Sequence, residues 1–85
     1  MSITEDEALV RIARNALQRK FGDNLPAFLR DPSITQVNFK DESIEGDYYR
    51  VVWVAGYCIY YVYINKASGQ CFADMLAFQI IPGAG

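Results

Sequence analysis

The residues best suited to molecular recognition in this 85-residue sequence are three tyrosines and one arginine. They occur in two neighbouring apolar segments, and within each segment the two residues are separated by one position. Alternate residues of a β-strand point to the same side of a sheet, so we expect all four side chains on one face. Tyrosine and arginine are enriched at the energetic centres of protein interfaces. The pattern therefore predicts a partner-binding surface made of Tyr48, Arg50, Tyr61 and Tyr63.

The groups that usually perform catalysis are scarce. The sequence contains no histidine, which excludes nucleophilic triads and dyads that use imidazole. Its glycines do not have the spacing of a phosphate-binding loop. Asp74 is the single acid of the last apolar segment, and we interpret it as a solvated residue of a sheet face. We therefore expect a protein that is not an enzyme and that binds no cofactor.

Metal binding and disulfide formation are also disfavoured. The acidic segment 41–47 offers oxygen ligands of the kind that calcium prefers, but it does not follow the EF-hand pattern, and charged loops are usually only solvated. Cys58 and Cys71, without histidine, do not supply a tetrahedral zinc set. In adjacent strands the two sulfurs would lie several residues apart, beyond the reach of a disulfide. We predict that both cysteines act as small buried apolar residues.

Charge and hydropathy exclude further classes of partner. The net charge is −2 and the eight basic residues are scattered, so we expect no binding to nucleic acid. The N-terminal residues are acidic where a secretory signal would be basic, and no apolar segment of membrane-spanning length follows. The sequence therefore predicts a cytoplasmic protein that does not bind membranes.

An amphipathic helix is predicted over residues 5–21. Thr4 and Glu7 have the spacing of a capping box, in which each side chain bonds to the backbone N–H of the other residue. Gly22 follows in the position of a left-handed C-terminal cap. One face of the helix is apolar because such residues recur at intervals of three and four. They are Ala8, Leu9, Ile12, Ala13, Ala16, Leu17 and Phe21.

The remainder of the chain has the pattern of an antiparallel sheet. We expect one α+β domain over residues 1–85, with one N-terminal helix packed across a four-stranded antiparallel β-meander. The smaller elements are a short turn or helix at 25–30 and a tail at 79–85. The predicted strands are 34–40, 48–54, 57–64 and 70–78.

The central hairpin decides which side chains share a face. We place its turn at Ala55–Gly56, which puts Arg50 opposite Tyr61 and Trp53 opposite Cys58. The Trp53 side is then expected to pack on the helix, and the Arg50 side to stay open. A slip of one residue would exchange the faces of one strand, and we prefer the first register.

The orientation of the last strand stays open at this point. Either Phe72 and Leu76 or Cys71, Ala73 and Met75 point inward, depending on the length of the loop at 65–69.

Three segments together resemble the PepSY-type domain. They are a helix start at 4–8, a tyrosine- and valine-rich hairpin, and the turn Asn65-Lys66-Ala67-Ser68-Gly69-Gln70, which is similar to an Asp-x-x-Thr-Gly-Glu pattern. Small cystatin-like proteins and bacterial immunity proteins share this order of elements. The resemblance implies a non-catalytic role in which the protein inhibits or masks a partner.

These observations lead to one functional hypothesis and two alternatives. The leading hypothesis is a non-enzymatic protein-binding module, of inhibitor or immunity type, that acts through the tyrosine-rich open face of the sheet. The first alternative is a homodimer that uses the same face for assembly. The second is a small-molecule-binding domain with a pocket between the helix and the Trp53 side of the sheet.

Overall fold

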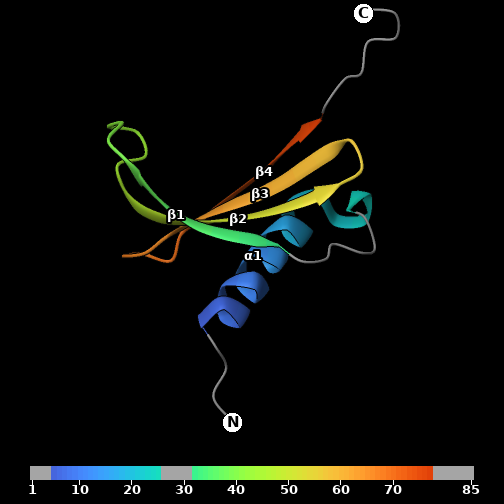
Figure 1. Ribbon diagram of the computed structural model, residues 1–85, viewed down its shortest axis with the longest axis horizontal. Coiled ribbons are helices and arrows are strands. Elements are labelled where there is room, and N and C mark those ends of the chain that lie inside the picture. Colours follow the sequence, from blue (N-terminus) through green and yellow to red (C-terminus); the bar gives the residue numbers. More distant parts are fainter. Residues whose placement is uncertain (1–4, 26–31, 78–85) are drawn as a thin grey trace, which may run out of the picture.

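The computed structural model describes residues 5–25 and 32–77 of the chain. Thr4 of the predicted capping box, most of the predicted turn at 25–30 and the tail at 79–85 lie outside these residues. The sheet has the strand order β1-β2-β3-β4 with antiparallel neighbours, so the predicted fold class is confirmed (Figure 1). The elements are α1 (Glu5–Phe21), the 3-10 turn η1 (Gly22–Asn24), β1 (Ser33–Phe39), β2 (Gly46–Ala55), β3 (Cys58–Asn65) and β4 (Cys71–Ala77).

Helix α1 has the bounds that the sequence predicts. Its first turn carries three acidic residues and its last turn carries Arg19 and Lys20, so charges of the favourable sign stand at both ends of the helix dipole. Gly22 ends the helix with a φ of 55°, the left-handed conformation that glycine adopts without steric cost. The buried residues of the helix are Leu9, Ala13, Ala16 and Leu17.

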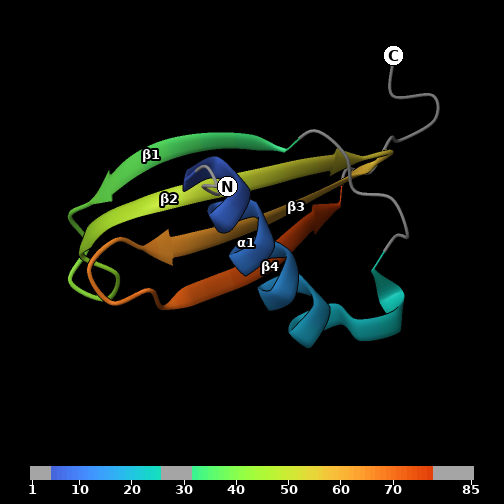
Figure 2. The same ribbon diagram turned by 90° about the horizontal axis from the view of Figure 1, so that it is seen from below.

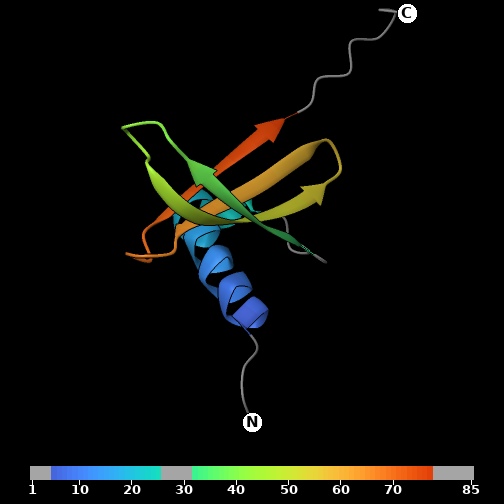
Figure 3. The same cartoon turned by 60° about the vertical axis from the view of Figure 1, so that its left-hand side comes forward.

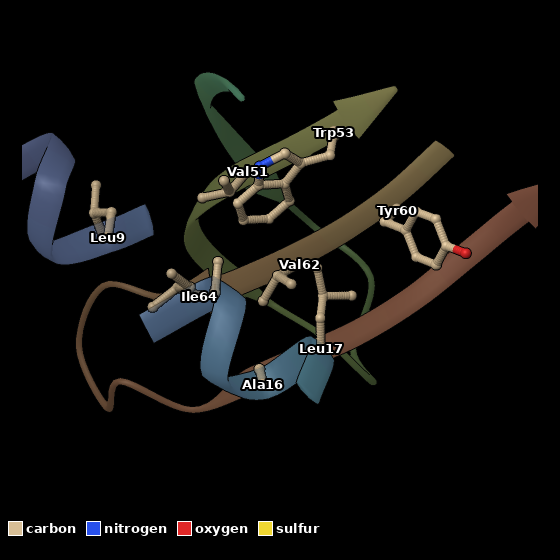
Figure 4. Packing of buried hydrophobic residues seen from close by; sticks show 9 residues of the cluster. Leu9, Ala16, Leu17, Val51, Trp53, Tyr60, Val62 and Ile64 are labelled. Atoms are coloured by element: carbon tan, nitrogen blue, oxygen red, sulfur yellow. The ribbon is translucent and has the colours of Figure 1, made fainter. Parts of the chain in front are cut away.

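The molecule has two layers, with α1 lying across one face of the sheet (Figure 2). Figure 4 shows Leu17 of the helix beside Val62, on the side of the sheet that also carries Trp53 and Tyr60, and Leu17 is fully buried. Val51, Trp53 and Val62 are fully buried as well. The prediction that the helix covers the Trp53 side of the sheet is therefore confirmed, and burial of these apolar side chains is the main stabilising term.

The turn of the β2–β3 hairpin lies one residue later than predicted. It consists of Gly56 and Tyr57, flanked by Ala55 and Cys58. Gly56 takes a φ of 63° at the first central position, where both favoured two-residue hairpin turns require positive φ. The predicted turn had Gly56 at its second central position. Because the first central position requires positive φ, which glycine adopts most readily, the turn forms one residue later.

The predicted register of this hairpin is therefore wrong by two residues. Arg50 lies opposite Tyr63 and not Tyr61, and Trp53 lies opposite Tyr60 and not Cys58. Because side chains alternate with a period of two, a shift of two residues leaves every side chain on its predicted face. The predicted assignment of side chains to the two faces is therefore correct, although the predicted residue pairs are wrong.

The loop between β3 and β4 settles the orientation of the last strand. The Asn65 side-chain oxygen accepts hydrogen bonds from the backbone N–H groups of residues 67 and 68, both at 2.9 Å, and Gly69 has a φ of 76°. Ile64 then pairs with Cys71. Consequently Cys71, Ala73 and Met75 pack toward the helix, and the alternate residues Phe72 and Leu76 point to the other face.

Cys58 and Cys71 are both free and partly buried. They lie opposite Ala77 and Ile64 respectively, far apart along their strands. Among the described residues, no helix combines the length and the apolarity needed to cross a membrane.

Candidate binding surface on the open face of the sheet

The face of the sheet that points away from α1 is called the open face here (Figure 3). Its side chains are the alternate residues of each strand, and the helix packs against the other set. All four tyrosine and arginine residues predicted to bind a partner belong to it. Its larger side chains are Val37, Phe39, Tyr48, Arg50, Val52, Val54, Ile59, Tyr61, Tyr63, Phe72 and Leu76.

Five aromatic rings gather at one end of the open face, and we call them the aromatic cluster. The ring centroids are 5.4 Å apart for Phe39 and Tyr48, 5.2 Å for Phe39 and Tyr63, and 5.6 Å for Tyr61 and Tyr63. Phe72 lies 6.2 Å from Tyr48. Most of these contacts are edge-to-face, the arrangement that the charge distribution of aromatic rings favours. The cluster thus joins all four strands without any contribution from the helix.

Exposure divides the predicted binding residues into two groups. Tyr48 is only 4% exposed, because the rings of Phe39, Tyr63 and Phe72 surround it. Its role is to support its neighbours, and it offers almost no surface of its own. Tyr61, Tyr63 and Arg50 remain partly exposed and are able to contact a partner.

Sequence reasoning missed two members of the cluster, Phe39 and Phe72. Phe39 shares one face of its strand with Val37 by alternation, but the sequence does not determine which face of the sheet this is. Phe72 was one of two alternatives for the last strand. The usable signal was Asn65, because an asparagine side chain that accepts from the N–H groups two and three residues later marks the start of a tight turn and so sets the register.

A hollow of about 500 Å³ opens over the aromatic cluster, within the size range of ligand pockets. Half of its lining residues are aromatic, and Lys20 and Asp74 add one charge of each sign, with 3.7 Å between Nζ and Oδ1. The lining residues are Lys20, Phe39, Ile44, Tyr48, Tyr61, Tyr63, Cys71, Phe72, Ala73 and Asp74.

The polar groups of this surface are held by neighbours on the same face. The Arg50 Nε donates to the Thr35 hydroxyl oxygen at 3.2 Å, which holds the guanidinium against β1. Burial, followed by the negative charge of Asp74 and the neighbouring Tyr63, raises the pKa of Tyr61 above its ordinary value. Tyr61 is therefore a neutral phenol at physiological pH, an apolar ring with a hydroxyl that can donate.

Exposed apolar side chains continue beyond the cluster toward the β2–β3 turn. Val54 is 70% exposed and Leu76 is 56% exposed, and Ile59 pairs with both of them across the sheet. The three residues form an apolar row over β2, β3 and β4. Adjoining apolar residues that remain exposed are typical of interaction surfaces.

The acidic loop between β1 and β2 is internally bonded. The Asp41 Oδ1 accepts from the Ser43 N–H at 3.0 Å and from the Ser43 hydroxyl at 2.9 Å, which lowers the pKa of Asp41. The Asp47 Oδ1 accepts from the Asn38 side-chain amide at 2.6 Å. Within residues 5–25 and 32–77, no three potential metal-ligating side chains are grouped together.

One alternative predicted a small-molecule pocket between the helix and the Trp53 side of the sheet. Trp53 lies completely buried under the helix. No acceptor among the described residues lies within reach of its Nε1–H. Hollows that adjoin both helix and sheet lie instead at the two edges of the sheet. One, of about 490 Å³, is lined by helix residues 6, 7 and 10 with Pro32 and Ile34, and another, of about 540 Å³, lies at the β4 edge. The hollow at the β4 edge is lined by Ala16, Arg19, Lys20, Gly69, Gln70, Cys71 and Ala73.

No protein-family model, curated protein or solved structure matches the chain. The resemblance to PepSY-type and cystatin-like domains therefore stays a prediction, and the candidate function rests on the geometry of the open face.

Proposed function

We propose that the chain is a non-enzymatic protein-binding module that docks a partner protein on the open face of its sheet. The observation that carries the proposal is the hollow of about 500 Å³ over the aromatic cluster, bordered by partly exposed apolar side chains. An inhibitor or immunity protein in the cytoplasm of a bacterium would use such a face to mask its target.

The residues of the open face have different roles in the proposed recognition. Buried Tyr48 holds the surrounding rings in place, so the surface is formed before a partner arrives. Phe72 and Leu76, which are 41% and 56% exposed, supply apolar area that a partner would remove from water. Tyr61 and Arg50 add hydrogen-bond donors beside that area, and aromatic and arginine side chains dominate the energy of many interfaces.

The proposal is tested with a pair of matched substitutions. Phe72 on the open face and Ile12 on the helix are both 41% exposed, so Phe72→Asp and Ile12→Asp place the same charge at equally exposed apolar positions. Each variant carries a photo-reactive amino acid at position 61 in cells of the source organism. We expect an adduct with a second protein in the unsubstituted background and in Ile12→Asp, and its loss in Phe72→Asp.

Two results would contradict the proposal. One is an adduct that Phe72→Asp leaves unchanged, and the other is an adduct of twice the chain's own mass, which would favour the homodimer on this face. Tyr61→Ser combined with Tyr63→Ser provides an independent check, because a folded double variant that still captures the partner is incompatible with recognition through these rings.

A second candidate function is favoured by the size of the same hollow, which also suits a small apolar molecule. Such a ligand would shift the ring resonances of Tyr61 and Tyr63. Trp53 lies on the opposite face of the sheet, so its fluorescence would not report binding there. Ring shifts on addition of a small aromatic compound, lost in Phe72→Asp, would support this candidate.

A further inference from the structure

The two edge strands of the sheet, β1 and β4, differ in how their outward backbone groups are satisfied (Figure 2). At β4 the carbonyl of Ala73 accepts from the Lys20 Nζ at 2.7 Å, and the N–H of Met75 donates to the Asp74 Oδ1 at 2.8 Å. In an antiparallel strand the outward groups belong to alternate residues, and these are two of them. Side chains therefore occupy the middle of the β4 edge, which is a common protection against pairing with another chain.

The outward groups of β1 follow from the hydrogen bonding of β2. The carbonyl of Asp47 accepts from the Lys66 N–H at 2.9 Å and thus points toward the β3 side. The alternate residues of β2, which include Tyr48 and Arg50, consequently direct their backbone groups toward β1. Their partners in β1 are Val37 and Thr35. The residues of β1 that lie between these positions direct their N–H and C=O groups away from the sheet, and they are Ile34, Gln36 and Asn38.

The side chains of β1 itself carry no charge at this edge. Residues 33–39 contain no charged residue and no proline, the usual protections of an exposed edge. Three polar side chains of the strand are bonded to residues of β2 or of the β3–β4 loop, and within the described part of the chain none of these bonds reaches the outward backbone groups. The bonded pairs are Thr35 with Arg50, Gln36 with Lys66, and Asn38 with Asp47.

We propose that β1 pairs with β1 of a second copy of this chain, antiparallel and about a two-fold axis at Gln36. The two Gln36 residues then lie opposite each other, and Ile34 of each copy lies opposite Asn38 of the other. All outward N–H and C=O groups of the three residues find partners in this register. The proposed partner strand is β1 of a second copy, because in this register each outward N–H of β1 meets an outward C=O of the same strand in the other copy. The absence of charged residues in 33–39 permits this symmetric pairing, since like charges directly opposite each other would repel.

The assembly leaves the proposed binding surface accessible. A two-fold axis perpendicular to the sheet continues the four strands into eight, with both helices on one side and both open faces on the other. The inference is independent of the proposed function, because it concerns backbone groups at the edge of the sheet and not side chains on its face.

Two substitutions at Gln36 separate pairing at the edge from folding of the single chain. Gln36→Glu allows an ion pair with Lys66 within one copy but places like charges across the axis. We expect the dissociation constant of the dimer to rise about fivefold. Gln36→Pro removes the exposed side-chain bond to Lys66 and one outward backbone donor, which an edge strand tolerates, and it deletes two hydrogen bonds per dimer. We expect a rise of about tenfold or more. Gln70→Glu makes the same change of charge in the β3–β4 loop and is expected to have no effect.

The measurements are sedimentation and amide hydrogen exchange of the purified chain from micromolar to millimolar concentration. We expect a dimer whose formation protects the amides of Ile34, Gln36 and Asn38, while those of Thr35 and Val37 are protected at every concentration. A monomer throughout this range would overturn the proposal. So would a dimer that both Gln36 variants leave unchanged, or one that Phe72→Asp abolishes, since the latter would place the interface on the open face.

Discussion

The two faces of the sheet use aromatic residues for different purposes. On the helix side, Trp53 is fully buried together with Val51 and Val62, and Leu17 of the helix closes over them. On the open face the rings pack mainly on one another, and Phe72 keeps 41% of its surface exposed. Alternate side chains of β2 and β3 therefore point to two different faces. One face stabilises the fold, and the other is available for recognition.

The largest expected effect comes from breaking the covered face. Trp53→Ala should reduce the free energy of unfolding by about 3–5 kcal/mol, because the cavity left beneath the helix cannot be filled by exposed neighbours. Chemical denaturation followed by circular dichroism measures the loss. A loss below about 1 kcal/mol would mean that the helix does not depend on this face.

The next effect tests whether the open face also has a core. Tyr48→Ala should cost about 2–4 kcal/mol of unfolding free energy, since this ring is 4% exposed and supports its neighbours. Tyr57→Ala is the matched control, because that ring is 66% exposed in the hairpin turn and its removal should cost under about 0.5 kcal/mol. Equal losses in the two variants would show that the aromatic cluster contributes nothing to stability.

A smaller effect is expected where the helix reaches the edge of the open face. Lys20→Ala removes the hydrogen bond to the Ala73 carbonyl and a solvent-exposed ion pair to Asp74. Unfolding free energy should fall by about 0.5–1 kcal/mol, because exposed ion pairs contribute little. The variant should also self-associate through the uncovered β4 edge. Size-exclusion chromatography that shows no change in association would argue that Lys20 does not protect this edge.

The smallest effect concerns the titration of single tyrosines. The pKa of Tyr61 is raised above 10.0, chiefly by burial and then by Asp74, so the neutral phenol is favoured in the folded state. The resulting stabilisation is fully present below the ordinary pKa and is lost as pH rises through the raised value. Asp74→Asn should lower the pKa of Tyr61 only in part, because burial remains.

Ring resonances followed by NMR between neutral and strongly alkaline pH measure this titration. Glu5→Gln is the control, since the Glu5 carboxylate accepts a hydrogen bond from the Tyr49 hydroxyl at 2.6 Å and raises the pKa of Tyr49. Glu5→Gln should lower the pKa of Tyr49 and leave the pKa of Tyr61 unchanged. A pKa of Tyr61 that Asp74→Asn leaves unchanged would show that Asp74 does not act on Tyr61.

Local patterns in the sequence were sufficient to predict the helix, the four strands and the assignment of the β2 and β3 side chains to two faces of the sheet. The spacing of apolar residues in α1 and the cap at Gly22 determine the helix and its buried side, because both act within a few residues. The period of two in β2 and β3 determines which side chains share a face. Tyr48, Arg50, Tyr61 and Tyr63 could be assigned to one surface for this reason.

Only the tertiary structure decided how the strands pair and which of these residues are exposed. Pairing in the β2–β3 hairpin depends on which position of the turn requires positive φ, a backbone property that leaves the side-chain period unchanged. Burial of Tyr48 depends on Phe39 and Phe72, which approach it from strands distant in the sequence. The sequence by itself determined that a tyrosine-rich face exists. The packing of four strands decided that Tyr48 supports that face while Tyr61, Tyr63 and Phe72 present it, because exposure depends on neighbours that no local pattern specifies.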